Sequence, residues 1–358
     1  GVPGEPAVLP LAPTARAVVL LVDGLGLELL DRHRDRAPFL SSLTSTRLTA
    51  GFPSTTATSL ASLGTGLPPG EHGVTGYTSW APEADAVVGW LTWTTGQQDL
   101  REQLVPEQVV PGLTVFERAE RAGVAVTVAA PAAFEGSGLT RAVLRGGRYR
   151  GAVTPGDAVA HAVTGSRLGR RSLVYCYTPD LDLIGHVRGT AGEAWAEQLA
   201  LVDAFAEQLA ARLPPGTVLH VTGDHGMVDV APGDRVDYDT SPVLQQGVRV
   251  LAGEPRMRHV HVAPGAVADV QATWEAELGD RAMVVRRQQA IDAGLLGPVV
   301  TPAAEARIGE LLVIATGGLA IVRSQVERLA SGLLGHHGAL SEAELAVPLL
   351  TSAAPAAG

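Results

Sequence analysis

Carboxylate and imidazole side chains stand close together at two places in this 358-residue chain, each time beside glycine. In the segment PDLDLIGH, Asp182 and His186 are four residues apart, so one helical turn would put both on the same face. In the segment TGDHG, Asp224 and His225 are adjacent, and the glycines allow the unusual turn that would present both side chains to one side. Carboxylate with imidazole is a common ligand combination for Zn²⁺. A loop aspartate beside a surface histidine is the alternative for the first pair, and an ordinary turn is the alternative for the second.

Two single positions add ligands of the same kind. Asp23 directly follows the apolar run Ala17 to Val22, where aspartate most often caps a helix. His337 belongs to the segment GHHG, in which glycines would let a loop present an imidazole as a ligand. Taken alone, Asp23 is better explained as a helix cap, and the histidine pair also fits a surface loop or the end of a helix.

A cluster of hydroxyl groups precedes a predicted helix in FPSTTATSLASLGTGLPPGEHG, residues 52–73. The helical pattern runs from Ala57 to Leu63, and the free N–H groups of its first turn would bind a phosphate oxygen. A threonine hydroxyl at this point could attack that phosphate if a metal ion activated it. By itself, the cluster is better explained as a plain helix cap.

The elements that must position these groups are short apolar strands. Runs of this kind span residues 17–22, 124–129, 172–177 and 217–221, and a long helical pattern spans Glu193 to Arg212. Strands that alternate with helices predict an α/β fold with a doubly wound, mainly parallel sheet sandwiched by helices. In such a sheet, the residues that follow each strand meet at one edge. The combined groups then suffice for two metal ions about 4 Å apart.

A small insertion interrupts this pattern. Residues 248–297 mix strand-like and helical patterns, which predicts an α+β cap over residues 241–304 and a core made of residues 1–240 and 305–358. The run Leu311 to Val322 resembles a hairpin that returns to the core. His259 and His261 alternate on a predicted strand, and we expect them on its surface.

Composition excludes several functions. Hydrophobic residues make up 46% of the chain and charged residues 18%, which is enough for a large core. The net charge is −10 and no basic cluster occurs, so a nucleic-acid polymer is not an expected partner. The first apolar run is too short for a membrane span. The single cysteine, Cys176, fits a reducing compartment, and we expect a cytoplasmic protein.

The order of these motifs resembles one known family. Asp23, FPxxT with TGxxPxxHG, DxxGH, GDHG and HHG follow one another as they do in the nucleotide pyrophosphatase/phosphodiesterase family of the alkaline phosphatase superfamily. The match extends from Asp23 to His337 and therefore covers nearly the whole chain. The resemblance implies an alkaline phosphatase-like α/β core with a cap, and a metal-dependent hydrolase of phosphodiester or nucleotide pyrophosphate substrates.

The resemblance also implies roles for individual residues. Thr56 matches the family's nucleophile, which would form a phosphothreonine intermediate at a two-zinc site. The ligands of the first zinc would be Asp182, His186 and His337. The ligands of the second would be Asp23, Asp224, His225 and the Thr56 oxygen. Mn²⁺ or Fe would suit the same ligand set.

The chain departs from the family pattern beside the nucleophile. Ala57 stands where the family has a base-stacking aromatic residue, and Tyr77 stands where an asparagine contacts the phosphate. We expect the Tyr77 hydroxyl to donate that hydrogen bond instead. Trp80, Trp90 and Trp93 are a candidate stacking wall for a base or aryl group, with ordinary packing as an equal alternative.

Three alternatives to a phosphodiesterase stay open at this point. A phosphonate hydrolase of the same superfamily would use the same zinc ions and threonine on a C–P bond, and a phosphomonoesterase ranks behind it. A non-catalytic metal-binding module would keep the ligands without turnover. The expected partner is a small phosphate-ester substrate, and the sequence leaves the oligomeric state open.

Overall fold

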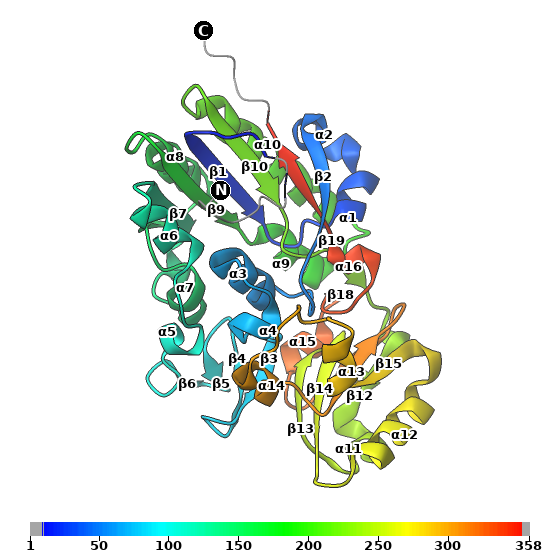
Figure 1. Cartoon of the computed structure of the whole chain (residues 1–358). Coiled ribbons are helices and arrows are strands. Elements are labelled where there is room, and N and C mark those ends of the chain that lie inside the picture. The colour runs from blue at the N-terminus through cyan, green and yellow to red at the C-terminus, as the bar shows by residue number, and fades with distance from the viewer. Residues whose placement is uncertain (1–8, 10, 353–358) are drawn as a thin grey trace.

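A seven-stranded sheet lies at the centre of the upper part of the molecule in Figure 1, a computed structural model that describes residue 9 and residues 11–352. In spatial order its strands are β2 (Thr44–Thr49), β19 (Ala346–Thr351), β10 (Thr217–Thr222), β1 (Arg16–Val22), β9 (Ser172–Thr178), β7 (Ala125–Pro131) and β8 (Arg148–Ala152). The strands from β10 to β8 run parallel, and β19 is antiparallel to both of its neighbours. The four apolar runs of the sequence become the adjacent strands β10, β1, β9 and β7, and the predicted fold class is confirmed.

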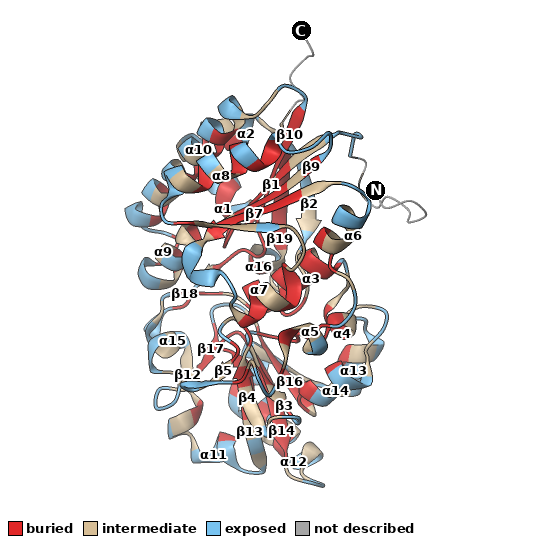
Figure 2. Cartoon of the chain, turned by 90° about the vertical axis from the view of Figure 1, so that its left-hand side faces the viewer, coloured by how far each residue is buried: buried red, intermediate tan, exposed pale blue. Residues whose placement is uncertain are grey.

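Helices cover both faces of this sheet and divide the core into two layers. Val18 and Leu20 of β1 pack in one layer with α8 (Pro155–Ser166) and α10 (Glu193–Arg212). On the opposite face, Tyr175 of β9 packs with α3 (Thr56–Thr65) and α7 (Gly138–Val143). The assignment of alternate residues to opposite faces follows the two-residue period of a strand. Cys176, next to Tyr175, is therefore in the first layer and fully buried. Figure 2 shows the buried residues along the strands and on the inner faces of the helices.

Shorter elements complete the upper part and its border. They are α1 (Leu27–Arg32), α2 (Pro38–Ser42), α4 (Pro69–His72), α5 (Pro106–Val109), α6 (Val115–Arg121), α9 (Asp180–Arg188) and α16 (Glu342–Leu345). A small antiparallel sheet consists of β3 (Thr78–Ala81), β4 (Ala86–Gly89), β5 (Thr94–Thr95) and β6 (Gln98–Asp99), and β11 (Val228–Asp229) pairs with β18 (Gly335–His336). Among the described helices, none combines the length and the apolar character that a membrane crossing requires.

The cap forms the lower part of Figure 1 and has its own sheet. Its order is β13 (Val248–Glu254), β14 (Met257–Val262), β16 (Leu311–Ala315) and β15 (Ala282–Arg286). The remaining elements of this region are α11 (Pro242–Gln245), α12 (Val267–Leu278), α13 (Arg287–Asp292), α14 (Pro302–Arg307) and α15 (Arg328–Gly332).

The expected hairpin over residues 311–322 is wrong. β16 joins the cap sheet between β14 and β15, whereas β17 (Ala320–Val322) pairs in parallel with β12 (Arg235–Asp237). A continuous apolar run fits any buried strand, so the sequence does not show which sheet it enters. The cap sheet therefore includes residues outside the predicted range 241–304, and the domain boundary itself stays a prediction.

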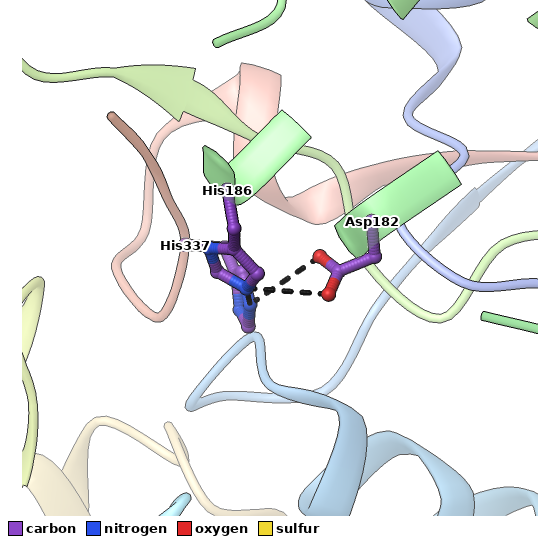
Figure 3. Close-up of side chains that lie close together, drawn as sticks. All are labelled: Asp182, His186 and His337. Atoms are coloured by element: carbon purple, nitrogen blue, oxygen red, sulfur yellow. Dashed lines mark hydrogen bonds and ion pairs between the residues drawn. The ribbon is translucent and has the colours of Figure 1, made fainter. Parts of the chain in front are cut away.

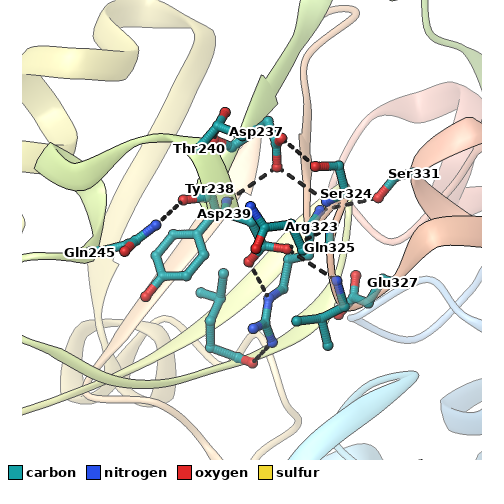
Figure 4. Close-up of polar contacts among 12 residues, drawn as sticks. Asp237, Tyr238, Asp239, Thr240, Gln245, Arg323, Ser324, Gln325, Glu327 and Ser331 are labelled. Carbon is teal, nitrogen blue, oxygen red and sulfur yellow. Dashed lines mark hydrogen bonds and ion pairs between the residues drawn. The ribbon is translucent and has the colours of Figure 1, made fainter.

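Carboxylates fasten β12 to the segment that follows β17 (Figure 4). Arg323 pairs with Asp239, with 3.3 Å between Nε and Oδ1, and the Ser324 hydroxyl donates a 2.6 Å hydrogen bond to Asp237. These contacts hold β12 and the residues just after it against the segment that follows β17.

The expectation that two cap histidines lie on a strand surface is also wrong. All residues of β14 are buried, including His259 and His261. A ring nitrogen of His259 lies 2.9 Å from the Thr75 carbonyl oxygen, so the segment before β3 covers this face of the cap sheet. Burial lowers the pKa of His259 to about 4 and that of His261 to about 3.

Candidate active site

The predicted metal ligands meet where three neighbouring strands end. Asp23 directly follows β1, Asp224 lies two residues beyond β10, and Asp182 lies in the first turn of α9, just after β9. Because β10, β1 and β9 are adjacent and parallel, their carboxyl ends lie at one edge of the sheet. The topology thus brings together three carboxylates that are distant in the sequence.

One group of ligands consists of Asp182, His186 and His337 (Figure 3). His186 Nε2 lies 3.2 Å from Asp182 Oδ2 and 3.3 Å from His337 Nε2, and His337 Nε2 lies 3.8 Å from Asp182 Oδ1. As predicted, Asp182 and His186 are one turn apart on the same helix face. His337 comes from the loop after β18.

The outer ring nitrogens of this group are held by backbone oxygens. His186 Nδ1 lies 2.7 Å from the Gly335 carbonyl, and His337 Nδ1 lies 2.8 Å from the Ser54 carbonyl. Because a carbonyl oxygen only accepts hydrogen bonds, each Nδ1 carries the proton and each Nε2 keeps a lone pair. Two lone pairs 3.3 Å apart repel each other unless a proton or a metal ion lies between them.

A second group surrounds the threonine hydroxyl. Thr56 Oγ1 lies 3.1 Å from His225 Nε2 and donates a 3.3 Å hydrogen bond to Asp23 Oδ1. His225 Nε2 also lies 3.4 Å from Asp23 and 3.6 Å from Asp224. The ligand atoms of Asp23, Asp182 and His225 all lie within 4.8 Å of one another, so Asp182 belongs to both groups.

The electrostatics of the cluster favour bound cations. Burial raises the pKa of Asp23 well above its ordinary value, and the charges of Asp224 and Asp182 raise it further. Burial and the neighbouring His225 hold the pKa of His337 far below its ordinary value. Within the described chain, Asp182 Oδ1 and Asp224 Oδ2 are buried and have no hydrogen-bond partner. Crowded carboxylates, unpartnered oxygens and facing imidazole lone pairs fit two divalent metal ions.

Helix α3 presents its amino end to the same place. Thr55 is the cap residue and Thr56 the first residue of the helix, and the Thr55 side chain makes no capping hydrogen bond. The N–H groups of the first turn therefore stay available for an anion. Thr56 is only 7% exposed, so a substrate that reaches it must enter an enclosed space.

A largely apolar cavity of about 360 Å³ opens beside Thr56. Its lining residues include Leu60 of α3, Leu139 and Leu144 around α7, and Tyr149 and Tyr175 of the sheet. Asp23, Thr56, Asp182 and His186 form the end that meets the ligand cluster. In the described part of the chain, no arginine lines this cavity.

Trp80, Trp90 and Trp93 belong to the packing of the protein and do not form a stacking wall at the cavity. Trp90 and Trp93 are fully buried and meet edge to face, with ring centroids 4.8 Å apart. Their indole N–H groups donate to Ser79 Oγ and the Leu104 carbonyl. Trp80 lies beneath the Arg249 guanidinium, and none of the three tryptophans lines the cavity. Ordinary packing therefore accounts for this cluster.

Tyr77 is not among the residues that line the cavity. The residue directly precedes β3 and is 41% exposed, and its hydroxyl makes no hydrogen bond among the described residues. Burial of the hydroxyl and the charges of Glu327 and Glu254 raise its pKa. The role predicted for Tyr77 on a phosphate oxygen stays a prediction.

Sequence reasoning missed several supporting residues. The Tyr177 hydroxyl donates to Asp23 Oδ2, and Ser59 donates a 2.8 Å hydrogen bond to the Asp224 carbonyl. Tyr177 lies inside an apolar strand, and only the two-residue alternation along β9 would have placed it on the cavity side.

An α/β sandwich with carboxylate and imidazole ligands at its strand ends, and a hydroxyl at a helix start, defines a metal-dependent hydrolase of the alkaline phosphatase type. The model of the type I phosphodiesterase/nucleotide pyrophosphatase family matches residues 17–340, and the chain belongs to this family. The predicted family and the predicted class of enzyme, a hydrolase of this type, are confirmed.

Solved structures show the same fold. Murine ectonucleotide pyrophosphatase/phosphodiesterase 5 is 18% identical, with a TM-score of 0.73 over 93% of this chain and 87% of that one. Phosphonoacetate hydrolase from Sinorhizobium meliloti 1021, in complex with phosphonoformate, is 18% identical, with a TM-score of 0.72 over 95% and 90% of the two chains.

A curated relative matches a shorter region. Phosphopentomutase of Methylobacterium radiotolerans is 31% identical over 189 residues, which is 47% of this chain and 39% of that protein. The match spans less than half of the relative's length, so it carries no assignment of activity.

Proposed function

We propose that this protein is a metal-dependent phosphodiesterase that cleaves small diesters through a phosphothreonine on Thr56. The observation that carries the proposal is the position of the Thr56 hydroxyl, 3.1 Å from His225 Nε2 and 3.3 Å from Asp23 Oδ1 at the open amino end of α3. A related structure supports this role for threonine. Murine ectonucleotide pyrophosphatase/phosphodiesterase 5 is described as inactive when one threonine is changed to alanine, in complex with AMP.

Two zinc ions fit the ligand groups best, because the set mixes imidazole with carboxylate and has no cysteine. Asp182, His186 and His337 would hold one ion, and Asp23, Asp224, His225 and the Thr56 oxygen the other. When bound, the ions supply positive charge that lowers the pKa of a hydroxyl and offsets the charge of the phosphate. Mn²⁺ or Fe would suit the same ligands.

The protein's own groups account for the rest of the reaction. The first-turn N–H groups of α3 bind non-bridging phosphate oxygens and hold the phosphorus opposite Thr56. Thr56 Oγ forms a bond to phosphorus while the bond to one ester oxygen breaks, and an alcohol leaves. The hydroxyl proton of Thr56 passes to the carboxylate of Asp23, whose Oδ1 already accepts its hydrogen bond. Water then cleaves the phosphothreonine, which restores Thr56 and releases a monoester.

The cavity beside Thr56 favours a diester with an apolar or aromatic ester group. Leucine and tyrosine side chains line it, and the carboxylates of Asp23 and Asp182 lie at the end that meets the ligand cluster. A carboxylate on the substrate, in addition to its phosphonate group, would meet no arginine there, which weighs against a carboxylated phosphonate. Phosphonate hydrolysis is the second candidate, and the shared fold of phosphonoacetate hydrolase is the observation that favours it.

The test compares zinc-loaded wild type with Thr56→Ala and Thr56→Ser on a bis-aryl phosphate, an aryl monophosphate and phosphonoacetate. We expect diester cleavage that a chelator abolishes, that Thr56→Ala lowers by about a thousandfold or more, and that Thr56→Ser partly keeps. Trapping of labelled phosphate on wild type but not on Thr56→Ala would mark the intermediate. Preference for the monoester or the phosphonate contradicts the substrate class, and full activity of Thr56→Ala contradicts the nucleophile.

A further inference from the structure

Glu254 is a buried carboxyl group of the cap that lacks a partner. It is the last residue of β13 and 4% exposed, and within the described chain neither of its oxygens makes a hydrogen bond. A buried polar group without a partner costs stability, so its presence calls for an explanation.

A nearby glutamate shows the usual arrangement. Glu344 is equally buried, pairs with Arg256 at 2.9 Å, and accepts hydrogen bonds from the Ala339 N–H and the Ser341 hydroxyl. Both glutamates therefore lie where the β13–β14 hairpin of the cap meets the core, and only Glu254 is left without a cation.

The carboxyl of Glu254 packs against the loop that carries a metal ligand. A Cβ atom on Gly338 would lie 2.6 Å from Glu254 Cγ and 3.1 Å from its Oε1, and Gly338 has a positive φ of 128°. Position 338 must therefore be glycine for the hairpin to fit. Because Gly338 directly follows His337, the Glu254 side chain restricts the loop on which the imidazole depends.

The second neighbour of Glu254 is the cap residue of the helix that carries the nucleophile. The Thr55 hydroxyl is buried and has no partner of its own, although threonine at this position usually bonds to an N–H group of the first turn. Burial raises the pKa of Glu254 to about 8, and the neighbouring Thr55 hydroxyl and Tyr77 N–H act against this rise. A neutral carboxyl can donate to one such neighbour and accept from another.

We propose that Glu254 is a positioning residue. Its carboxyl engages the Thr55 hydroxyl and keeps it from capping α3, and its side chain packs against Gly338 and restricts the loop there. The N–H groups of the first turn are then free for a phosphate oxygen, and Thr56 and His337 are held at a fixed separation. This role rests on the function proposed above. It explains why the cap keeps an unpaired acid at this point and why the cap residue of α3 does not cap the helix.

The test uses Glu254→Gln, Glu254→Met, Thr55→Val, Thr55→Ser and the double variant Glu254→Met/Thr55→Val. In the zinc-loaded enzyme we expect Glu254→Met to lower kcat/KM by about tenfold to a hundredfold, because the released Thr55 hydroxyl can then cap α3. Thr55→Val has no hydroxyl that could cap the helix and should stay within about threefold of wild type. Glu254→Gln and Thr55→Ser keep the hydrogen-bonding groups and should stay close to wild type. The double variant should be faster than Glu254→Met alone, because it leaves no hydroxyl that could cap α3.

Thermal unfolding separates positioning from structural support. An apolar side chain of similar length replaces an unpaired buried acid, so Glu254→Met should unfold at the wild-type temperature or above it. The control is Glu310→Met, another cap carboxylate, which accepts a hydrogen bond from the Val262 N–H and should leave kcat/KM unchanged. Wild-type kcat/KM in Glu254→Met, a double variant no faster than Glu254→Met, or a loss of kcat/KM that follows a loss of stability would each overturn the proposal.

Binding of inorganic phosphate to the zinc-loaded protein keeps the two proposals distinguishable. If the wild type cleaves no diester, the proposed function fails, and phosphate affinity then decides the role of Glu254. We expect about tenfold weaker phosphate binding in Glu254→Met, and wild-type binding in Glu254→Gln and Thr55→Val. Equal affinity in all variants would overturn the positioning role.

Discussion

The core and the cap differ in whether their buried charged side chains have partners. At the strand ends of the core, the carboxylates of Asp23, Asp182 and Asp224 crowd together, and two of their oxygens have no partner among the described residues. At the cap, Arg256 and Arg258 each meet a glutamate at less than 3 Å. The carboxylates of the core cluster fit cations supplied from outside, whereas each arginine of β14 is already paired with a glutamate, Arg256 with Glu344 of α16 and Arg258 with Glu327. Within the described chain, unpaired carboxylates therefore mark the reaction centre, and paired arginines mark the support that holds it, with the unpaired Glu254 as an exception in the cap.

The largest effect should come from the residue that both ligand groups share. Asp182→Ala removes oxygens from both groups, so we expect activity to fall by about a thousandfold or more and bound metal to drop from about two ions per chain to about one or fewer. Elemental analysis and diester assays measure both quantities. Asp180→Asn, on the same helix but outside both groups, is the matched control. Full metal content in Asp182→Ala would contradict the assignment of the ligand groups.

A balanced pair in the cap should matter mainly for stability. Arg256→Met leaves the buried Glu344 without its cation, so we expect the free energy of unfolding to fall by about 3–5 kcal/mol. Chemical unfolding measures this value. The control is Arg47→Met, which breaks an exposed pair with Glu342, a residue of α16 like Glu344. This change should lower the free energy of unfolding by about 1 kcal/mol or less. Equal losses in the two variants would remove the contrast between buried and exposed pairs.

Acid should weaken the packing between cap and core through His259. Its pKa is lowered to about 4 in the folded protein, against about 6.5 in the unfolded chain. The unfolded chain therefore takes up the proton first, so stability is fully present above pH 6.5 and declines as the pH falls toward 4. His259 should account for a loss of about 2 kcal/mol between pH 7 and pH 5. Unfolding of His259→Gln should show a smaller pH dependence than unfolding of the wild type, and an equal dependence would contradict this role of His259.

The smallest expected effect concerns Tyr77. If its hydroxyl donates one hydrogen bond to a phosphate oxygen, Tyr77→Phe should lower kcat/KM for a diester by about threefold to tenfold. Steady-state kinetics measure the change. The control variant is Tyr238→Phe, which removes a tyrosine hydroxyl of the cap. No difference from wild type would remove Tyr77 from the site and leave phosphate recognition to the helix end.

The sequence predicts the core of this molecule better than its cap. Short apolar runs followed by Asp or His are typical of parallel strands, and parallel strands bring their carboxyl ends together whatever their exact register. The meeting of Asp23, Asp182 and Asp224 could therefore be predicted from three separate segments. The contact between Thr56 and His225 depends on where α3 begins. The hydroxyl-rich segment before the helix indicates that starting point in the sequence.

The cap depends on long-range pairing that leaves no local pattern. Residues 311–315 are apolar throughout, so only their neighbours β14 and β15 show to which sheet they belong. His259 alternates like a surface residue, but a segment almost two hundred residues earlier in the chain covers it. Glu254 gives no signal either, because its burial results from the packing of the hairpin on Gly338.

The single cysteine gives the protein a built-in reporter of its own unfolding. Cys176 is 0% exposed in the layer between the sheet and its helices, and burial raises the pKa of its thiol to about 12. A thiol-labelling reagent can therefore modify it only when β9 opens, since the thiolate is the reactive form. β9 leads into the helix that carries Asp182. The labelling rate of Cys176 with and without added zinc therefore measures how strongly metal binding suppresses the opening of β9.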